Sequence, residues 1–307
     1  MLAVLASFGL AGYVRSYVAE AIELLSRGRS MELVRTFEHG AGGTSLARLD
    51  GEPVVVKAWL TTREREQTLN TGLNCANIMA DRSVPIPRLL ERGIVGNYSY
   101  LLYEYVEGEW PARVDPNLAD QMLALTELQR DAAPRSDPDS PAHVARMISD
   151  GDPSLDIHPE RLRTHAQGQA ILRATQAALD TCDPRHLRSK DVVHGDFAPE
   201  NLLVNGGQIS AVIDWEQSRT GDVAFDLAGM IYDIELGKKA SPQVLASLYR
   251  AINSRVPPDA WQLYTGIYAI RYASWALTTD METDVLNTIN AVNAARYMTG
   301  CVRPGCT

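Results

Sequence analysis

The chain has 307 residues, of which 45% are hydrophobic and 22% charged, the composition of an ordinary folded protein that can bury a large core. Residues 1–105 carry 11 Lys and Arg against 11 Asp and Glu, so residues 106–307 carry the whole net charge of −9. An acidic surface repels nucleic acid and anionic lipid, so we expect neither a nucleic acid nor a membrane as a partner.

The opening residues, MLAVLASFGLAG, are apolar for only about a dozen positions and have no positive leader, which argues against a signal peptide and a membrane span. We expect a packed helix there and an amphipathic helix over residues 13–28. The four cysteines are scattered and lack metal-site partners, so we expect free thiols in a cytoplasmic protein. They are Cys75, Cys182, Cys301 and Cys306.

Residues 31–60 read as three strands, the first two joined by a glycine-rich turn. The turn contains Gly42, Gly43 and Thr44 but no Gly-Lys-Ser/Thr, so it is not a Walker A loop. A glycine-rich hairpin can instead offer backbone N–H groups to phosphates. The β-branched run after it ends at Lys57, which could reach a phosphate or extend into water.

A helix is expected from Thr62 onward, with Glu64 and Glu66 in its first turns. The prolines of residues 84–87 then favour an extended segment, because each proline disfavours helical geometry in the preceding residue. Residues 98–106 (YSYLLYEYV) form a strongly β-prone run.

Beyond residue 106 the chain reads as mostly helical. Asn117 is the expected cap of one helix, residues 131–153 read as loops around a short helix, and residues 159–180 read as a longer helix. Asp150 and Asp152 could face a polar substrate or only cap turns. A later aromatic stripe at helical spacing is expected to be core first: Trp261, Tyr264, Tyr268, Tyr272 and Trp275.

Between these helical regions lies VVHGDFAPENLLVNGGQISAVIDWE, residues 192–216, which reads as a strand, a polar loop and a hairpin. Asp196 lies on the loop, Asn201 follows five residues later, and Asp214 ends the hairpin. These three side chains can converge on one cleft. Asn201 and Asp214 offer the oxygen ligands that magnesium prefers, which leaves Asp196 to face a substrate hydroxyl.

HGDFAPEN resembles the HGDxxxxN catalytic loop of the aminoglycoside phosphotransferase family, and IDWE stands in the place of the D-F-G motif of kinases. The resemblance implies an α+β, two-lobed protein-kinase-like fold. Residues 1–105 would form an N-terminal nucleotide-binding lobe, an antiparallel sheet with a helix. Residues 106–307 would form a mostly helical lobe for catalysis and substrate binding.

Carried over by position, the resemblance makes Asp196 the catalytic residue that accepts the proton of the acceptor hydroxyl. It makes Asn201 and Asp214 the Mg²⁺ ligands, and Lys57 the residue that steadies the α- and β-phosphates. Lys57 then needs an acidic partner, for which Glu66 is favoured over Glu64.

The same resemblance places the linker between the lobes near residues 104–106, with adenine bonded to the backbone near Glu104 and Val106. Tyr103 would lie at the back of the base pocket. His194 and Asp226 would support the catalytic loop, with Asp226 bonding its backbone. Gln129 stands where relatives often have a histidine, and Glu216 joins the candidates for substrate contact.

The implied activity is transfer of the γ-phosphate of ATP or GTP to a hydroxyl of an antibiotic, an aminoglycoside or another polar one, for resistance or self-protection. A metabolic kinase for choline, homoserine, methylthioribose or a sugar is an alternative. A catalytically silent nucleotide-binding module is another. Nucleotide and small molecule are the expected partners of a monomer or homodimer.

Overall fold

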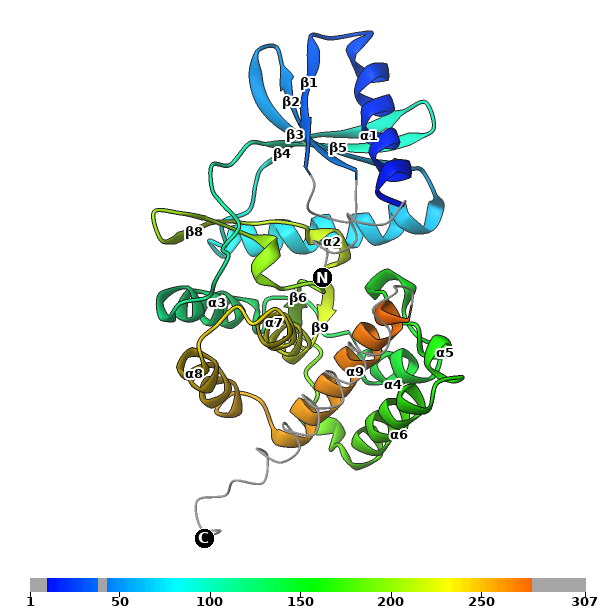
Figure 1. The fold of residues 1–307 in the computed structure, drawn as a ribbon, viewed down its shortest axis with the longest axis vertical. Coiled ribbons are helices and arrows are strands. Elements are labelled where there is room, and N and C mark those ends of the chain that lie inside the picture. Colours follow the sequence, from blue (N-terminus) through cyan, green and yellow to red (C-terminus); the bar gives the residue numbers. More distant parts are fainter. Residues whose placement is uncertain (1–9, 38–42, 138, 278–307) are drawn as a thin grey trace. The chain divides into compact units, whose positions relative to one another are not determined.

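The computed structural model describes residues 10–37, 43–137 and 139–277 (Figure 1). Contacts within the chain divide it into two compact units. The sheet unit comprises Met1–Asn70, Pro85–Pro111 and Leu202–Ile213. The helical unit comprises Thr71–Val84, Ala112–Asn201 and Asp214–Thr307.

The sheet unit is built on five antiparallel strands in the order β1-β2-β3-β5-β4. The strands span Met31–Thr36 (β1), Thr44–Leu49 (β2), Glu52–Leu60 (β3), Leu89–Val95 (β4) and Tyr98–Glu104 (β5). The three strands predicted over residues 31–60 and the β-prone run at residues 98–106 are thereby confirmed.

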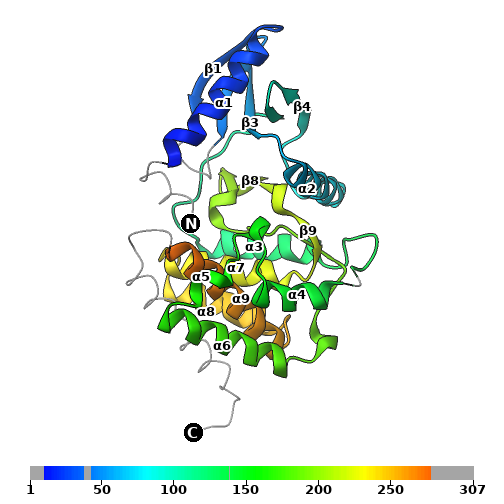
Figure 2. The same ribbon diagram turned by 90° about the vertical axis from the view of Figure 1, so that its right-hand side faces the viewer.

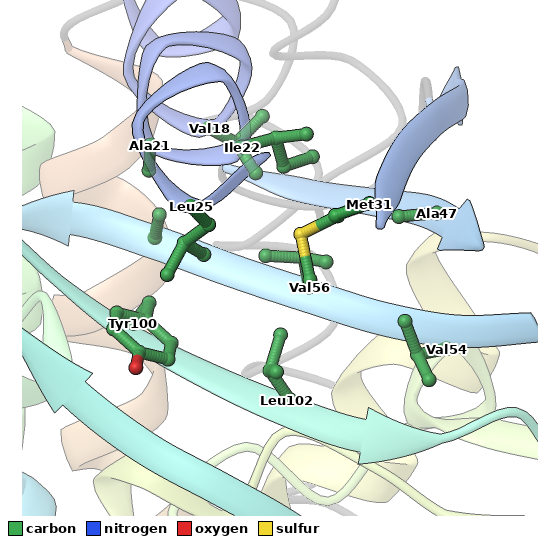
Figure 3. Packing of buried hydrophobic residues seen from close by; sticks show 11 residues of the cluster. Val18, Ala21, Ile22, Leu25, Met31, Ala47, Val54, Val56, Tyr100 and Leu102 are labelled. Atoms are coloured by element: carbon green, nitrogen blue, oxygen red, sulfur yellow. The ribbon is translucent and has the colours of Figure 1, made fainter. Parts of the chain in front are cut away.

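Helix α1 (Leu10–Ser26) covers one face of this sheet. Its buried residues are spaced three and four apart, which places them on one side of the helix: Val18, Ala21, Ile22 and Leu25. Figure 3 shows these side chains packed over alternate residues of the two central strands, namely Val54, Val56, Tyr100 and Leu102. The core on this face is therefore apolar.

A second hairpin, formed by β7 (Leu202–Asn205) and β8 (Gln208–Val212), completes the sheet unit. Glu109 and Val204 exchange two backbone hydrogen bonds, both of 2.9 Å, which attach the hairpin to the segment after β5. The hairpin turns at Gly206 and Gly207, both with positive φ. Helix α2 (Arg63–Asp81) begins in the sheet unit and ends in the helical unit.

The helical unit carries a two-stranded sheet, β6 (Asp191–Val193) with β9 (Arg219–Gly221), which the sequence did not predict. Its helices are α3 (Pro116–Gln129), α4 (Ser140–Ser149), α5 (Pro159–Leu162), α6 (Ala166–Thr181), α7 (Ala224–Leu236), α8 (Pro242–Asn253) and α9 (Pro258–Ala276). Helix α9 packs against both α6 and α7 (Figure 2).

The aromatic residues predicted as core lie on α9. Tyr264, Tyr268 and Tyr272 are all buried, and the Tyr272 ring stacks on Tyr232 of α7 with 5.4 Å between ring centroids. This stripe therefore joins α9 to α7, as its helical spacing predicts.

Two local predictions were wrong. The cap of α3 is Asp115 and not Asn117, because Pro116 fits the first helical position and the Asp115 side chain accepts from the Leu118 N–H at 2.8 Å. The helix predicted over residues 159–180 is interrupted between α5 and α6. There Arg163 donates to the Ser149 carbonyl, and Gln169 donates to the Arg163 carbonyl, each at 2.7 Å.

Candidate active site

The loop that carries Asp196 follows β6 in the helical unit. The first residue of this strand, Asp191, is fully buried and binds Arg188 through both carboxylate oxygens, with the shortest contacts at 2.8 Å. Asp191 also accepts hydrogen bonds from the backbone N–H groups of Asp131 and Val223. One buried carboxylate thus fixes the strand that leads into the loop.

The start of the loop is held by Asp226 on α7. This buried carboxylate accepts from the backbone N–H groups of His194 at 2.6 Å and Gly195 at 2.9 Å. Gln129 of α3 donates to it as well, at 2.7 Å. Burial raises the pKa of Asp226, and these donors offset part of that rise. Asp226 therefore contacts the loop where it would support it.

His194 is fully buried inside the loop. Its Nδ1 accepts from the Asp196 N–H at 3.3 Å, and its ring meets Trp215 with 4.6 Å between centroids. Because Nδ1 acts as an acceptor, the neutral ring carries its proton on Nε2. These contacts suit a supporting role.

Gly195 has a φ of +87°, in the region that L side chains rarely adopt. A Cβ atom at this position would lie 2.9 Å from the Gln217 carbonyl oxygen. The backbone therefore needs glycine here in order to place His194 and Asp196 on opposite sides of it.

Asn201, in the 3-10 turn Pro199–Asn201, faces back to Asp196. Its Nδ2 donates to the Asp196 carbonyl at 2.7 Å and to the Asp196 Oδ2 at 3.0 Å. Both partners are acceptors, so the amide nitrogen must be the atom on this side. The amide oxygen Oδ1 is then the atom that Asn201 can offer to a cation.

The Asp196 carboxylate is also bound by Arg271 of α9, which donates from Nη2 to Oδ1 at 2.9 Å. Burial raises the pKa of Asp196, but the charges of Arg271 and His194 and the Asn201 hydrogen bond outweigh it and hold the pKa below its ordinary value. Asp196 is thus a carboxylate throughout the neutral range, able to accept a proton or orient a hydroxyl.

Asp214 follows β8 and begins the 3-10 turn Trp215–Gln217, which also contains Glu216. Its φ of +68° and ψ of 46° are left-handed, a geometry uncommon for residues other than glycine. Departures of this kind concentrate at functional sites. The carboxylate of Asp214 and the amide oxygen of Asn201 are hard ligands of the type that Mg²⁺ takes.

A magnesium site with two protein ligands also agrees with the rest of the donor set. Over the part of the chain that the structure describes, no group of three or more His, Cys, Asp or Glu side chains could hold a metal ion. Mg²⁺ commonly binds one or two side chains and completes its shell with water and phosphate oxygens. Asn201 and Asp214 fit that pattern.

Lys57 lies on β3 of the sheet unit, between residues that face α1. It pairs in register with Thr44 of β2 and with Leu101 of β5. Since strand residues alternate in direction, Lys57 and Thr44 share the sheet face opposite α1. Gly43 accepts from the Ala58 N–H at 2.9 Å, whereas Gly42 lies outside the described residues.

Glu66, the favoured partner of Lys57, lies on α2. Arg92 donates to its Oε2 at 3.0 Å, while Oε1 is buried and has no hydrogen-bond partner among the described residues. Glu64 is exposed. The buried acceptor on Glu66 suits a lysine ammonium, so the pairing of Lys57 with Glu66 stays a prediction that this geometry favours over Glu64.

The residues predicted to hold the base lie at the end of β5. Tyr103 pairs with Val55 in register, on the same sheet face as Lys57. Glu104 is tied to Arg88 by its backbone N–H, which donates to the Arg88 carbonyl at 3.0 Å, and by its side chain. Val106 follows the strand and is half-buried. No statement about the base follows from these positions alone.

Asp150 and Asp152 lie after α4. Asp150 is exposed at the helix end, whereas Asp152 accepts from Arg219 at 2.7 Å, with His143 3.3 Å from the same oxygen. Its other oxygen accepts from the Ser154 N–H and hydroxyl. These contacts account for Asp152 as a clamp on the turn that follows it.

Sequence reasoning missed the part played by Arg271 and left that of Gln129 open. Arg271 lies 75 residues after Asp196, inside an aromatic helix that reads as core, and carries no motif. The signal that could have found it is a lone arginine flanked by tyrosines three residues before it and one after, at positions that must be buried. Gln129 binds Asp226, and its Oε1 is buried without a hydrogen-bond partner among the described residues.

Cys75 and Cys182 are free thiols, as predicted, and Cys301 and Cys306 lie outside the described residues. Burial raises the pKa of Cys75 to about 11. Within residues 10–37, 43–137 and 139–277, no helix has the length and apolarity needed to cross a membrane.

Comparison with known proteins gives one consistent result. The model of the phosphotransferase enzyme family matches residues 34–262. The aminoglycoside 3'-phosphotransferase of Streptomyces fradiae is 31% identical over 169 residues, which cover 50% of this chain and 60% of the relative. The hygromycin-B 4-O-kinase of Escherichia coli is 26% identical over 176 residues, which cover 50% of this chain and 49% of the relative. The matches thus span only about half of each relative's length.

Among solved structures, a thermostable mutant of aminoglycoside phosphotransferase APH(4)-Ia, in a ternary complex with ADP and hygromycin B, has the same fold. The TM-score is 0.63 at 15% identity, over 92% of this chain and 100% of that chain. This likeness confirms the α+β, two-lobed kinase-like fold predicted from the sequence. Because the family model matches well over half of the residues, the chain belongs to the aminoglycoside phosphotransferase family.

Proposed function

We propose that this protein is a small-molecule kinase that transfers the γ-phosphate of a nucleoside triphosphate to a hydroxyl group. The observation that carries the proposal is the arrangement of Asp196 and Asn201. The amide nitrogen of Asn201 is committed to Asp196, so its oxygen remains for a cation, and Asp196 stays ionised beside it. An anionic base next to a cation ligand is what phosphoryl transfer requires.

In this proposal Asp196 orients the acceptor hydroxyl and takes its proton as the bond from oxygen to the γ-phosphorus forms and the bond to the leaving diphosphate breaks. Asn201 and Asp214 would hold Mg²⁺, which when bound neutralises charge on the phosphates. His194, Asp226 and the backbone of Gly195 keep the loop in place. Glu216, beside Asp214, is a candidate for substrate contact.

The nucleotide is assigned to residues 1–105 and the acceptor to residues 106–307. Lys57, with Glu66 as its partner, would steady the α- and β-phosphates. The backbone at Gly43 and Thr44 would cover them, and Tyr103, Glu104 and Val106 would hold the base. ATP is the first donor to test, supported by the ADP in the related APH(4)-Ia complex, and GTP is the second.

We infer that the acceptor is a hydroxylated antibiotic and that the enzyme acts in the cytoplasm. The relatives named above are kinases of aminoglycosides and of hygromycin B. The acidic excess of residues 106–307 favours an acceptor that carries amines. Choline, homoserine, methylthioribose and sugars remain alternative acceptors of the same chemistry.

The test is a phosphotransfer assay on the purified chain with Mg²⁺ and either ATP or GTP labelled at the γ-phosphate. The acceptor panel joins aminoglycosides and hygromycin B with the metabolic acceptors, and resistance of a host expressing the chain is measured in parallel. We expect label on an antibiotic hydroxyl, lost in Asp196→Asn while nucleotide affinity is kept. Label only on a metabolic acceptor would replace the antibiotic assignment, and nucleotide binding without transfer would favour a silent binding module.

A further inference from the structure

Arg271 lies in the middle of α9 with a side chain only 1% exposed, whereas the Asp196 side chain that it binds is 19% exposed. A buried guanidinium is costly unless its charge and its N–H groups are satisfied. Here the charge is met by Asp196. The arginine is thus hidden behind the proposed base, while the base keeps an accessible edge.

The guanidinium binds two successive residues of the catalytic loop. Its Nη1 donates to the Gly195 carbonyl at 2.9 Å, and its Nη2 donates to Asp196 Oδ1 at 2.9 Å. Nη1 also meets the Tyr268 hydroxyl at 3.2 Å, and the charge lies 5.4 Å from the centre of the Tyr268 ring. A planar fork fixes both the backbone and the side chain that follows it, which a lysine cannot do.

We propose that Arg271 is a positioning residue for the reaction: by binding the Gly195 carbonyl and Asp196 Oδ1 together, it fixes the carboxylate in the orientation that faces the acceptor hydroxyl. The inference rests on the proposed function of Asp196. Arg271 touches neither nucleotide nor acceptor in this arrangement and acts through Asp196 alone.

Opposite Arg271, Asn201 donates to Asp196 Oδ2, so each carboxylate oxygen has one donor. Two donors on different oxygens set the plane of the carboxylate and leave further lone pairs for a hydroxyl. The fork on one side and the amide on the other therefore hold the side chain in one rotamer. This matters because a misplacement of about 1 Å can cost about 100-fold in rate.

The electrostatic surroundings of this pair are mixed in sign. His194 of the loop faces Asp196 beside Arg271, and Asp233 of α7 is a second carboxylate close enough to interact with it. Tyr268, Tyr272 and Asp156 interact with Arg271. Asp233 itself accepts from the Tyr272 hydroxyl. Since the neighbours other than His194 are acidic or neutral, Arg271 supplies most of the positive charge that keeps Asp196 ionised.

The pairing is tested by stability, which does not depend on turnover. Thermal midpoints of the full chain are measured for Arg271→Met, Asp196→Asn and the double variant. Each single change leaves one buried group without its partner, so each should lower the midpoint, and the double variant should recover part of the loss. Strictly additive losses would overturn the pairing.

The positioning role is tested by kcat and its pH profile. Arg271→Met should lower kcat by about 100-fold with nucleotide affinity little changed. It should also move the acidic limb of kcat upward by about 1 to 2 pH units, because burial then raises the pKa of Asp196 without an opposing charge. Arg271→Lys keeps the charge but loses the fork, so it should restore the acidic limb and only part of kcat.

The matched control is Arg255→Lys, at an arginine that binds Glu127 at 2.5 Å away from the loop, and it should change neither kcat nor the limb. An Arg271→Met enzyme with wild-type kcat and an unmoved limb would overturn the positioning role. If the wild-type chain transfers phosphate to no acceptor while the stability coupling is present, the proposed function fails and the catalytic role of Arg271 fails with it. The measured coupling separates that result from a failure of the pairing itself.

Discussion

The two units of this protein bury different kinds of side chain. The core under α1 is apolar, and the fully polar groups buried in the described part of the sheet unit are Ser45 and Ser99. The described part of the helical unit buries charged or titratable groups around the catalytic loop: Asp191, His194, Asp222, Asp226, Asp233 and Arg271. Each such group costs desolvation energy that its hydrogen bonds must offset.

This difference teaches where stability and activity depend on the same residues. In the sheet unit, apolar packing stabilises the fold without touching the residues proposed for proton transfer. In the helical unit, Asp226 and Arg271 stabilise the fold through the same contacts that place Asp196. Changes in the two units should therefore divide into those that lower stability alone and those that lower stability and kcat together.

The largest expected effect is that of Asp226→Ala. The change leaves the N–H groups of His194 and Gly195 and the amide of Gln129 without their acceptor, all in a buried place. Leaving buried donors unsatisfied costs about 1 to 3 kcal/mol each, with partial relaxation, so we expect a loss of about 4 kcal/mol. Urea denaturation measures it, and kcat of the folded fraction should fall about 100-fold because Asp196 moves with the loop.

Gln129→Met is the control, since it removes one of these donors at similar volume and leaves the loop N–H groups bound. It should cost about 1 kcal/mol and change kcat little. An Asp226→Ala protein with wild-type kcat would show that the loop keeps its shape without Asp226.

The next largest effect is expected in the sheet unit, from Leu102→Ala. Leu102 is fully buried in the cluster that α1 covers (Figure 3), so the loss of its side chain should leave a cavity and cost about 3 kcal/mol. Well below its melting temperature, this variant should keep the wild-type kcat, because its contacts lie within the sheet unit.

Ile94→Ala in the same sheet is the matched control, since Ile94 is 61% exposed and its truncation should change stability by less than about 0.5 kcal/mol. A drop in kcat for Leu102→Ala equal to that for Asp226→Ala would erase the distinction between the two units.

The sequence predicted most of the architecture because its signals are local. The spacing of Val18, Ile22 and Leu25 marks a helix face, and Gly206-Gly207 marks a hairpin turn. The five-residue gap from Asp196 to Asn201 likewise places both on one short loop. The pairing of β6 with β9, the break between α5 and α6 and the cap at Asp115 were not predicted, because they depend on partners chosen in three dimensions or on two competing capping residues.

The missed part of the candidate site has the same cause. Arg271 and Asp196 are 75 residues apart, and neither the arginine nor its helix carries a pattern that names its partner. Glu66 gives the opposite lesson: sequence spacing pointed to Lys57, and the structure adds Arg92 as a partner that no local pattern predicts. Long-range ion pairs are set by packing, which a single sequence does not display.

The smallest effect, and the sharpest comparison of the two units, uses one substitution at two glycines. Gly195 and Gly206 both have positive φ, +87° and +59°, so alanine is strained at each. At Gly206, in the sheet unit, a Cβ would meet nothing within 4 Å, and we expect a loss of about 1 kcal/mol with unchanged kcat. At Gly195 the Cβ would lie 2.9 Å from the Gln217 carbonyl oxygen, so the loss should be about 2 kcal/mol.

The kinetic readout separates strain from position at these two glycines. Relief of the contact at Gly195 must move the backbone whose carbonyl binds Arg271 and whose next residue is Asp196, so kcat should fall more steeply than stability. Urea denaturation and steady-state kinetics on Gly195→Ala and Gly206→Ala measure both quantities. Equal kcat in the two variants would mean that the loop tolerates this shift, and that burial of charge around it serves the fold more than the placement of Asp196.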